Sequence, residues 1–415
     1  MPKTKTVCRL LLFFVMVMLL TGCWDRGELE DKSYVIGLGL DLSKQEGKIK
    51  VTMLLANPEV GSMQGGGGST EEAREIISFD ANDFIAAKAT ANSVISRSIS
   101  YELLRIFVVS EEFARDSMFT TTFFEVLKDK EIRLNSYLAV SKEKAAQYFL
   151  KNKPKMETRP HKYFQFMVDH GIENGLIPDS TLFRYFQSAE RGTDLFLAMY
   201  TTAIRQNNPR IQMEDEYMAG ELNATGELDN TQFIGSAVFK KGVMIDKLTG
   251  QETRTVNILD DTTNIKDILV NLTDPFSDSK EQIAARIMKT KGNEIKMNLK
   301  GVRPQIFITI PLQFEIMSNP SKANYAIEKN RQKLRKHIAD HIEKMNEDLL
   351  KKTQTKLKGV PFPLPIYAKK YFGTIQEYKK FNWEKSYLRA DIHVKPEIEI
   401  VDYGKDTNRP IKVGQ

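Results

Sequence analysis

Cys23 carries the most distinctive chemistry of the chain, because it ends the sequence Leu-Thr-Gly-Cys at residues 20–23. A branched apolar residue and two small residues before a cysteine are typical of bacterial lipoproteins, in which the thiol is lipidated and the chain is cut before it. Three cations and the apolar run 10–20 precede this motif. That run is too short for a spanning helix, which needs about 20 residues. We therefore predict a signal peptide over residues 1–22 and a covalent diacylglycerol on Cys23, against a plain signal peptide or a stunted membrane anchor.

A second candidate for chemistry is a histidine pair. His337 and His341 stand four residues apart, which places them on one face of a predicted helix with Asp340 beside them. Such a pair can hold a metal ion, but the glutamate of a zinc-protease motif and a third ligand cluster are missing. The pair also adjoins the apolar stripe of that helix, where half-exposed imidazoles are common. We predict no metal site; the other histidines are His161, His170 and His393.

Catalytic motifs are missing from the rest of the sequence. The chain contains no Gly-x-Ser-x-Gly motif, and the glycine run at 65–68 lacks the Gly-Lys-Ser/Thr ending of a phosphate loop. Gly37 and Gly39 lack the third glycine of a dinucleotide fingerprint, so we interpret them as part of a strand with a close backbone neighbour. Since Cys8 lies in the signal peptide, the mature chain keeps only the lipidated cysteine and forms no disulfide. The sequence predicts a protein that is not an enzyme and binds no further cofactor.

Two stretches could form interaction surfaces. Residues 367–387 are rich in aromatic side chains, and Tyr378 and Trp383 are the candidates for a partner interface, although a role in the core is the commoner reading. Residues 151–162 carry five cations around two prolines. Such a run is usually a solvated linker, and contact with anionic lipid headgroups is the alternative for a tethered chain.

Composition is that of a globular protein with room for two or three domains: 415 residues, 41% hydrophobic and 27% charged. Three of the +6 formal charges lie in residues 1–22, so the mature body is close to neutral. That balance gives little support for nucleic-acid binding. After the signal peptide, no apolar stretch is long enough to predict a membrane span.

The first part of the mature chain alternates between strands and helices. Residues 34–41 and 49–55 predict a hairpin. Residues 104–109 and 137–140 predict buried strands that alternate with helices near 84–94, 119–127 and 145–150. This order indicates an N-terminal α/β domain over 23–160 with the hairpin at one edge of its sheet. Residues 161–230, with helices near 163–170 and 182–188 and a strand near 195–204, are predicted to form a middle domain or linker unit.

The last part, residues 231–415, predicts a C-terminal α+β domain. It opens with a hairpin whose turn is Lys241-Gly242, and apolar residues alternate strictly along 306–316 and 392–400. That period of two predicts half-buried antiparallel strands, with Pro396 at a sheet edge or bulge. Between them a helix is expected, opened by Pro320-Ser321 and ended by the turn and prolines of 359–365, with an apolar stripe for the sheet. The stripe comprises Ile327, Leu334, Ile338, Ile342, Met345 and Leu349.

Several of these segments together resemble one family. The motif at 20–23 continues as Trp24-Asp25-Arg26-Gly27-Glu28-Leu29, and the strand at 36–41 reads Ile-Gly-Leu-Gly-Leu-Asp. Further matches are Gly-Ser-Ala-Val-Phe-Lys at 235–240, Leu-Thr-Gly-Gln-Glu-Thr-Arg at 248–254, Asn-Trp-Glu-Lys at 382–385 and the final alternating strand. The chain resembles the Ger(x)C family, the C-subunit lipoproteins of spore germinant receptors. It departs from the family at 359–365, where an Asp-Phe/Ile-Phe-Gly-like turn is usual.

The resemblance implies a three-domain α+β lipoprotein on the outer face of the inner (cell or spore) membrane. It also implies that the chain supports germination by assembling with an integral-membrane B subunit and a large A subunit, with direct and indirect contact with the nutrient germinant both left open. The family brings no catalytic residues with it. The rival hypotheses are a stand-alone extracytoplasmic solute-binding lipoprotein, which would have two similar lobes around a hinge, and a cell-wall enzyme.

Overall fold

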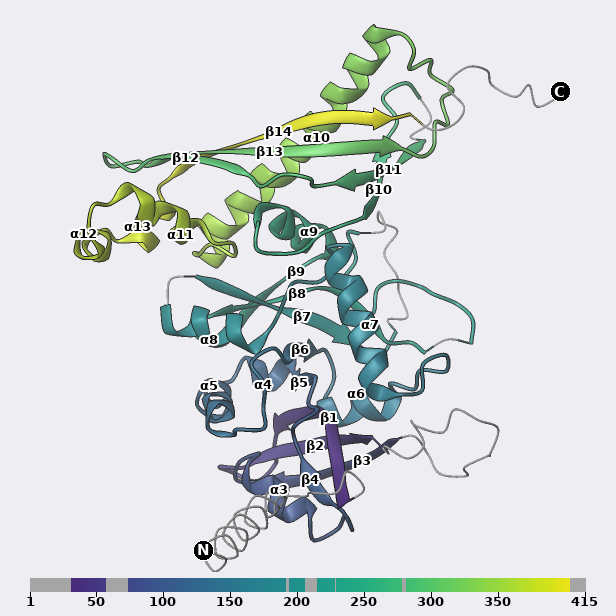
Figure 1. The fold of residues 1–415 in the computed structure, drawn as a ribbon, viewed down its shortest axis with the longest axis vertical. Helices are drawn as coiled ribbons and strands as arrows, with labels where there is room; N and C mark the ends of the chain where they lie inside the picture. The colour runs from purple at the N-terminus through teal and green to yellow at the C-terminus, as the bar shows by residue number, and fades with distance from the viewer. Residues whose placement is uncertain are drawn as a thin grey trace, which may run out of the picture.

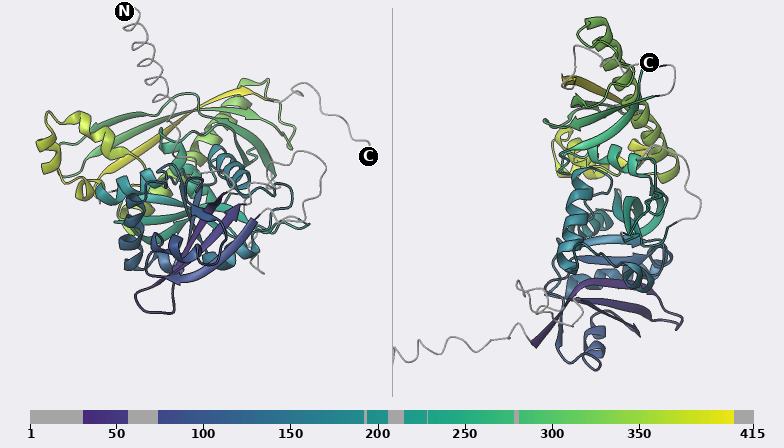
Figure 2. Two further views of the ribbon diagram at one scale, coloured as in Figure 1. Left: turned by 60° about the horizontal axis from the view of Figure 1, so that its bottom comes forward. Right: turned by 90° about the vertical axis from the view of Figure 1, so that its right-hand side faces the viewer.

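The structure is a computed structural model that describes residues 31–56, 74–191, 194–205, 215–227, 229–277 and 281–403. Two β-sheets follow one another along the long axis of an elongated molecule, with helices around them (Figures 1 and 2). We call them the first and the second sheet. The predicted α+β class, with mixed sheets and a long helix on the C-terminal sheet, is confirmed. None of the helices in the described ranges combines the length and the apolar character needed to cross a bilayer.

The first sheet has nine strands and runs in the order β3-β2-β1-β5-β6-β7-β8-β9, with β4 beside the start of β1. Its central strands β1, β5, β6 and β7 are parallel, and antiparallel strands extend it on both sides. The strands are β1 (Lys32–Leu42), β2 (Ile49–Ala56), β3 (Arg74–Ala81), β4 (Ser98–Ser100), β5 (Ile106–Ser110), β6 (Tyr137–Ser141), β7 (Leu195–Thr202), β8 (Gln232–Lys240) and β9 (Val243–Leu248).

Helices cover both faces of the first sheet, which is why its central strands are continuous apolar runs. Every residue of β5 and of β7 is buried. One face packs against α3 (Ala86–Ala91), α4 (Glu111–Ala114), α5 (Ser117–Phe124) with the short helix Glu125–Lys128, and α8 (Leu182–Arg191). The other face packs against α6 (Ala145–Lys151) and α7 (Pro160–Glu173).

Two glycines of β1 allow α6 to lie close to the sheet. A Cβ atom on Gly37 would stand 2.8 Å from the Phe149 ring, and one on Gly39 would stand 2.9 Å from the Ala145 Cβ. The predicted strand is confirmed, and the close neighbour of these glycines is the side-chain layer of α6 rather than a backbone. Because Ala145 meets Gly39 and Phe149 meets Gly37, α6 runs toward the beginning of β1.

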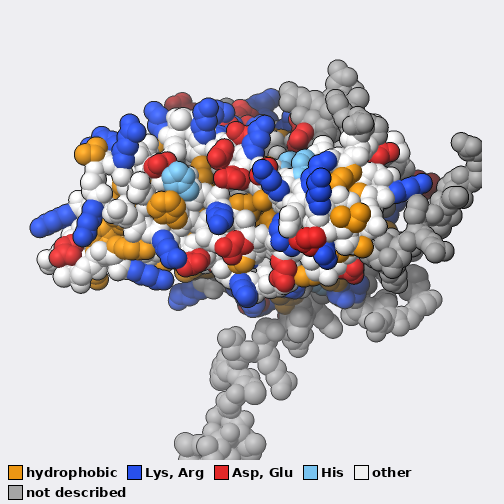
Figure 3. All heavy atoms as spheres, turned by 90° about the horizontal axis from the view of Figure 1, so that it is seen from above, with side chains coloured by type: hydrophobic (Ala, Val, Ile, Leu, Met, Phe, Trp, Pro, Cys, Tyr) orange, Lys and Arg blue, Asp and Glu red, His pale blue; other side chains and the backbone are white. Residues whose placement is uncertain are grey.

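The second sheet has five strands, and the long β13 is its centre. β11 and β12 pair antiparallel with the two halves of β13, β10 pairs with β11, and β14 lies along the other side of β13. Seen from this end of the molecule, cations, anions and small apolar patches are interspersed (Figure 3). The strands are β10 (Ile268–Thr273), β11 (Gln282–Met288), β12 (Glu294–Asn298), β13 (Gln305–Ile316) and β14 (Asp391–Asp402).

The helix α10 (Glu328–Lys352) covers one face of the second sheet. Its buried residues Leu334, Ile338, Ile342 and Leu349 belong to the same core as the even-numbered residues of β13. The helix α9 (Gly250–Leu259), opened by a Thr249–Glu252 capping box, lies between the two sheets. A π-helical turn (Thr353–Leu357) continues α10, and a helical cap follows: α11 (Leu364–Ala368), Lys369–Tyr371, α12 (Ile375–Lys380) and α13 (Trp383–Tyr387).

Two predictions about this region were wrong. β14 is parallel to β13 instead of antiparallel, because α10 carries the chain back so that β14 starts beside the start of β13. Alternation reports burial on one face and says nothing about strand direction. The helix also begins at Glu328 instead of near Pro320, and Ile327, predicted in its stripe, is 50% exposed. The position of the Pro396 strand at a sheet edge is confirmed.

The predicted borders at 160/161 and 230/231 do not coincide with a change of sheet. β7 comes from the predicted middle unit and pairs with β8 from the predicted C-terminal unit. The hairpin of β8 and β9, with both Lys241 and Gly242 at positive φ in its turn, completes the first sheet. The division into 23–160, 161–230 and 231–415 stays a prediction about independent folding units.

Candidate functional site

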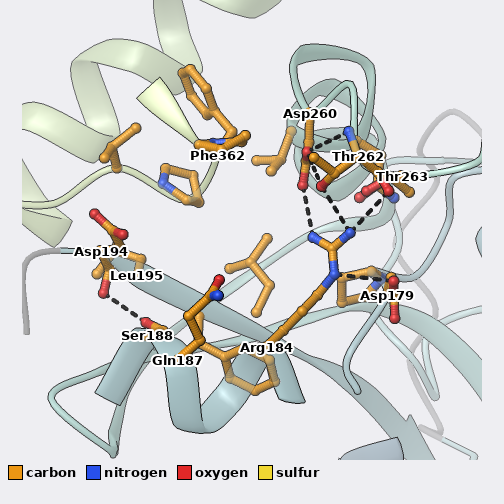
Figure 4. A pocket seen from close by; sticks show the side chains of 18 of the residues that line it. Asp179, Arg184, Gln187, Ser188, Asp194, Leu195, Asp260, Thr262, Thr263 and Phe362 are labelled. Carbon is orange, nitrogen blue, oxygen red and sulfur yellow. Dashed lines mark hydrogen bonds and ion pairs between the residues drawn. The ribbon is translucent and has the colours of Figure 1, made fainter. Parts of the chain in front are cut away.

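A groove of about 390 Å³ opens where the first sheet meets the segment that follows α10 (Figure 4). One wall is formed by α8 and the start of β7. The other walls come from the end of α9 with the following loop and from residues 360–366. The groove therefore brings together three segments that lie far apart in the sequence, and it lies at the junction of the two parts of the molecule.

The wall at 360–366 is held by backbone pairing to β7. The Leu195 amide donates to the Val360 carbonyl at 2.9 Å, and Asp194 and Val360 form an isolated parallel bridge. A Cβ atom on Gly359 would lie 2.9 Å from the Leu195 side chain, so this position needs glycine. Lys358 before it adopts a left-handed conformation with φ 51°. The segment that departs from the usual family turn thus docks the C-terminal part onto the first sheet.

Arg184 is the central polar side chain of the groove. Its guanidinium contacts Asp179 and Asp260 at 3.0 Å each and donates to the Thr262 carbonyl and hydroxyl at 3.0 and 2.8 Å. Asp260 is buried, so Arg184 also compensates its charge. Because these contacts occupy the guanidinium, Arg184 ties α8 to the loop after α9 instead of presenting a free cation.

The remaining lining of the groove mixes polar and apolar groups. Ser188 donates to the Asp194 carbonyl at 3.0 Å, and Arg191 lies 3.7 Å from the Asp194 carboxylate. Phe183 and Ile366 are 56% and 42% exposed. With its carboxylates engaged by arginines, the groove offers hydrogen bonding and apolar contact, and its geometry suits binding or domain junction better than proton transfer.

A second hollow adjoins this groove and contains both predicted interface residues. Tyr378 and Trp383 line it together with Arg191, Asp194 and Ile366, which the two hollows share. Trp383 is 4% exposed and stacks with Tyr387 at a centroid distance of 6.3 Å. Trp383 therefore belongs to the core, and a partner could contact it only at the floor of this hollow.

Tyr378 is half-buried. Its hydroxyl donates to the Pro365 carbonyl at 3.3 Å, the Phe372 ring packs edge-on at 5.5 Å, and the Lys369 ammonium lies 5.6 Å over its face. Burial raises the pKa of its hydroxyl, with the nearby Asp194 charge acting in the same direction. Tyr378 keeps part of its ring available at the surface, and its role as an interface residue stays a prediction.

The helical cap around Tyr378 presents an exposed surface that combines positive charge and apolar groups. Ile375 is 75% exposed and Tyr371 is 47% exposed. The exposed lysines of the cap are Lys369, Lys370, Lys379, Lys380 and Lys385. The sequence analysis considered only the aromatic residues of this stretch and did not predict that Ile375 is exposed. Ile375 follows the helix cap Thr374 and belongs to no apolar stripe, and this position is the signal that could have indicated its exposure.

The two histidines of α10 lie as a half-exposed pair. His337 Nε2 is 3.0 Å from the Thr273 hydroxyl, and burial together with the neighbouring His337 lowers the pKa of His341. Within the described ranges no three His, Cys, Asp or Glu side chains gather as metal ligands would. Cys23, the predicted lipidation site, lies outside the described residues, as do residues 1–22.

Comparison with known proteins assigns the chain. The family model described as "Spore germination protein N-terminal domain" matches residues 25–202, and the model "Spore germination B3/ GerAC like, C-terminal" matches residues 234–404. Spore germination protein KC of Bacillus subtilis (strain 168) is 22% identical, covering 97% of this chain and 96% of that protein. The Putative spore germination protein YfkR of the same strain is also 22% identical, covering 96% and 97%.

A solved structure supports the same fold. The crystal structure of the GerBC protein aligns with a TM-score of 0.53 at 14% identity and covers 90% of this chain and all of that one. Family models account for both parts of the molecule on either side of the groove. On these grounds, the chain belongs to the Ger(x)C family of spore germination proteins.

Proposed function

We propose that this protein is the membrane-anchored C subunit of a nutrient germinant receptor, and that it supports germination by assembling with the A and B subunits without catalysing a reaction. The observation that carries the proposal is the match of both family models across nearly the whole described body. The relatives named as spore germination proteins are matched along almost their entire length. The anchor in this proposal is a diacylglycerol on Cys23, which lies in a suitable sequence motif.

Replacing Cys23 tests the anchor. The change Cys23→Ala removes the thiol of the lipidation motif, so a two-chain anchor is lost and the precursor stays unprocessed. We expect no incorporation of radiolabelled palmitate and a germination defect in spores that carry only this variant. Equal incorporation of label into the variant and the wild-type chain contradicts the assignment of Cys23.

For assembly, we propose that the helical cap contacts another receptor subunit. Its exposed Ile375, the partly exposed Tyr378 and the surrounding lysines combine apolar contact with positive charge, which favours a partner surface with apolar and acidic groups. A tethered protein has a high effective concentration for partners in the same membrane, so a modest surface suffices. Tyrosine is among the side chains that most often supply a large share of the binding energy in such surfaces, which singles out Tyr378.

Two variants test the cap, Ile375→Ala and Tyr378→Ala, with Val302→Ala as the matched control because Val302 is 80% exposed outside the cap. We expect either cap variant to reduce co-purification of the A and B subunits while Val302→Ala has no effect. Melting of the isolated protein should be unchanged for Ile375→Ala. If all three variants co-purify equally well, the contact surface lies elsewhere.

If the protein is instead a solute-binding lipoprotein, the groove beside α8 is the candidate binding site. It has hydrogen-bonding side chains and apolar walls, as small-molecule sites do. However, the two sheets differ in strand number and order, so the described residues do not show the two similar lobes that a hinged solute-binding protein would have. Calorimetry of the purified protein with amino-acid and sugar germinants separates the hypotheses. Saturable binding that Phe183→Ala abolishes would favour a solute-binding protein.

A further inference from the structure

The connection between α6 and α7 joins positive charge to exposed apolar side chains. Leu150 is 58% exposed and Met156 is 90% exposed. Five cations lie in the same segment, against the single acid Glu157, and we call residues 150–162 the basic segment. Its cations are Lys151, Lys153, Lys155, Arg159 and Lys162.

Most of this charge is not neutralised within the described residues. Lys151, Lys153 and Lys155 are exposed, and the one ion pair among them joins Lys155 to the exposed Glu227 at 3.7 Å. Arg159 pairs with Glu157 at 2.8 Å. An exposed pair of this kind contributes little to stability, so the lysines are available to an external anion. Met156 follows Lys155 and is nearly fully exposed, so its side chain does not pack in the core.

The basic segment begins beside the residues that lead into β8, because Asn152 donates to the Asp229 carboxylate at 3.3 Å and to the Thr231 hydroxyl at 2.9 Å. α6 runs toward the beginning of β1, and the segment follows α6 directly. At its far end, burial lowers the pKa of His161, and the positive charges of Arg159, Lys162 and Arg105 act in the same direction. Arg105 in turn donates its amide to the Ile36 carbonyl in β1 at 2.9 Å.

The distance from the proposed anchor limits how this end can be placed. Eight Cα–Cα steps lead from Cys23 to Asp31, the first described residue, and each spans at most about 3.6 Å, which gives roughly 29 Å of reach. β1 to β3 lie at one end of the long axis and the second sheet lies at the other (Figure 1). A lipid on Cys23 therefore keeps Asp31, and with it the end of the molecule that holds β1 to β3, within about 29 Å of the bilayer surface.

We propose that the basic segment is a membrane-contact surface that binds anionic phospholipid, with its lysines on the headgroups and Met156 and Leu150 at the acyl boundary. This inference rests on the proposed lipid anchor. Lysines near an anionic leaflet are attracted within a Debye length, and exposed apolar side chains partition into the interface. The contact holds the body in one orientation on the bilayer.

A single fluorescent label tests the proposal in the complete lipoprotein. Cys8 is removed with the signal peptide and Cys23 is blocked by lipid, so Met156→Cys supplies the one free thiol for an environment-sensitive NBD dye. The labelled protein is incorporated into phosphatidylcholine vesicles with or without phosphatidylglycerol. We expect blue-shifted emission and quenching by spin-labelled lipid with phosphatidylglycerol, and weaker signals without it. Val302→Cys, 80% exposed near the second sheet, is the control label and should remain solvent-like.

Charge removal makes the test specific. With the Met156→Cys label, the combined change Lys151→Gln, Lys153→Gln and Lys155→Gln should reduce the fraction of label in contact with lipid by roughly tenfold or more. The same number of charges removed from α10, at the exposed Lys329, Lys336 and Lys344, should leave the label unchanged. Raising the salt concentration should act like the first variant, because it screens the charges. Thermal unfolding checks that both variants fold.

The outcomes separate this proposal from the proposed function. Solvent-like emission at position 156 on anionic vesicles overturns the membrane contact, whether or not the receptor assembles. A shift that appears only after the A and B subunits are added assigns the segment to a protein contact instead. If a second thiol is labelled, Cys23 carries no lipid and the anchor itself fails. Mass spectrometry detects that case before the vesicles are used.

Discussion

Phe107 in β5 and Phe307 in β13 occupy central strands of the two sheets, yet their surroundings differ completely. Phe107 is fully buried and meets Phe123 edge-on at 5.3 Å, whereas Phe307 is 45% exposed and stacks on His393 at 5.2 Å. Within the described residues, helices cover both faces of the first sheet, whereas α10 and the helical cap pack in a core on one face of the second sheet. The central strands of the first sheet should therefore tolerate substitutions poorly on both faces, whereas the second sheet has one tolerant face.

The largest effect is expected in the centre of the first sheet. Phe107→Ala removes a fully buried ring from a close-packed layer, which should lower the free energy of unfolding by about 3–5 kcal/mol. Urea unfolding followed by far-UV circular dichroism measures this loss. A change below about 1 kcal/mol would mean that the site collapses around the smaller side chain and that the two-sided packing matters less than proposed.

A somewhat smaller effect is expected under the covered face of the second sheet. Ile338→Ala in α10 removes a buried contact to the β13 core and should cost about 2–5 kcal/mol. Trp383 lies in the same core, so its fluorescence in a Trp24→Phe background reports unfolding of this part. If the Trp383 signal is unaffected while the circular dichroism midpoint falls, α10 stabilises the first sheet instead.

An intermediate effect involves Glu111, which joins α4 to β7 and β9. Burial alone would raise the pKa of Glu111, but hydrogen bonds from Tyr200 and Arg115 and the Lys247 charge outweigh it and lower the pKa. A lowered pKa means stability that is present above the unfolded value near 4.3 and is lost as the pH falls through the folded value. Glu111→Gln should cost about 1–2 kcal/mol at pH 7.

The same variant should also unfold with a weaker dependence on pH between about 5 and 3 than the wild-type chain. Glu315→Gln is the matched control, since Glu315 pairs with Arg286 at 2.8 Å in the second sheet and is about one-third exposed. It should change the free energy of unfolding by less than about 1 kcal/mol. If the free energy of unfolding depends on pH equally in the Glu111 variant and the wild-type chain, Glu111 does not contribute to the loss of stability in acid.

The smallest effect is expected on the open face of the second sheet. Phe307→Ala should lower stability by less than about 1 kcal/mol, because much of the ring is already in water and only its stacking on His393 is lost. Urea unfolding beside Phe107→Ala compares one residue type in two environments. A loss as large as that of Phe107→Ala would show that the open face is covered in solution, for example by another copy of the chain.

The same contrast explains what could be predicted from the sequence. Buried runs such as Ile106–Ser110 and the alternation along β13 identified strands because burial leaves a direct pattern. The strand β3 was not predicted, because it lies at the edge of the sheet and most of its residues are only half-buried. The direction of β14 was predicted wrongly, because side chains alternate in the same way in parallel and antiparallel strands.

The candidate groove could not be predicted from the sequence. Its lining depends on Arg184 meeting Asp260 and on Val360 pairing with Leu195, contacts between residues separated by long stretches of chain. Gly359 was noticed as the end of a helix, although its closeness to the Leu195 side chain is a second reason for glycine there. The aromatic stretch was found, but composition could not distinguish the buried Trp383 from the half-exposed Tyr378.

The parallel pairing of β13 with β14 also sets an order in time. The strands of the first sheet are complete once Leu248 has been synthesised, whereas Gln305 in β13 waits for Asp391 in β14. Closing so long a loop is slow, and chains fold from the N-terminus as they are made. Until β14 arrives, one edge of β13 is unpaired and open to association with other chains. A newly made chain is therefore most prone to aggregate in the interval between completing α10 and adding its last strand.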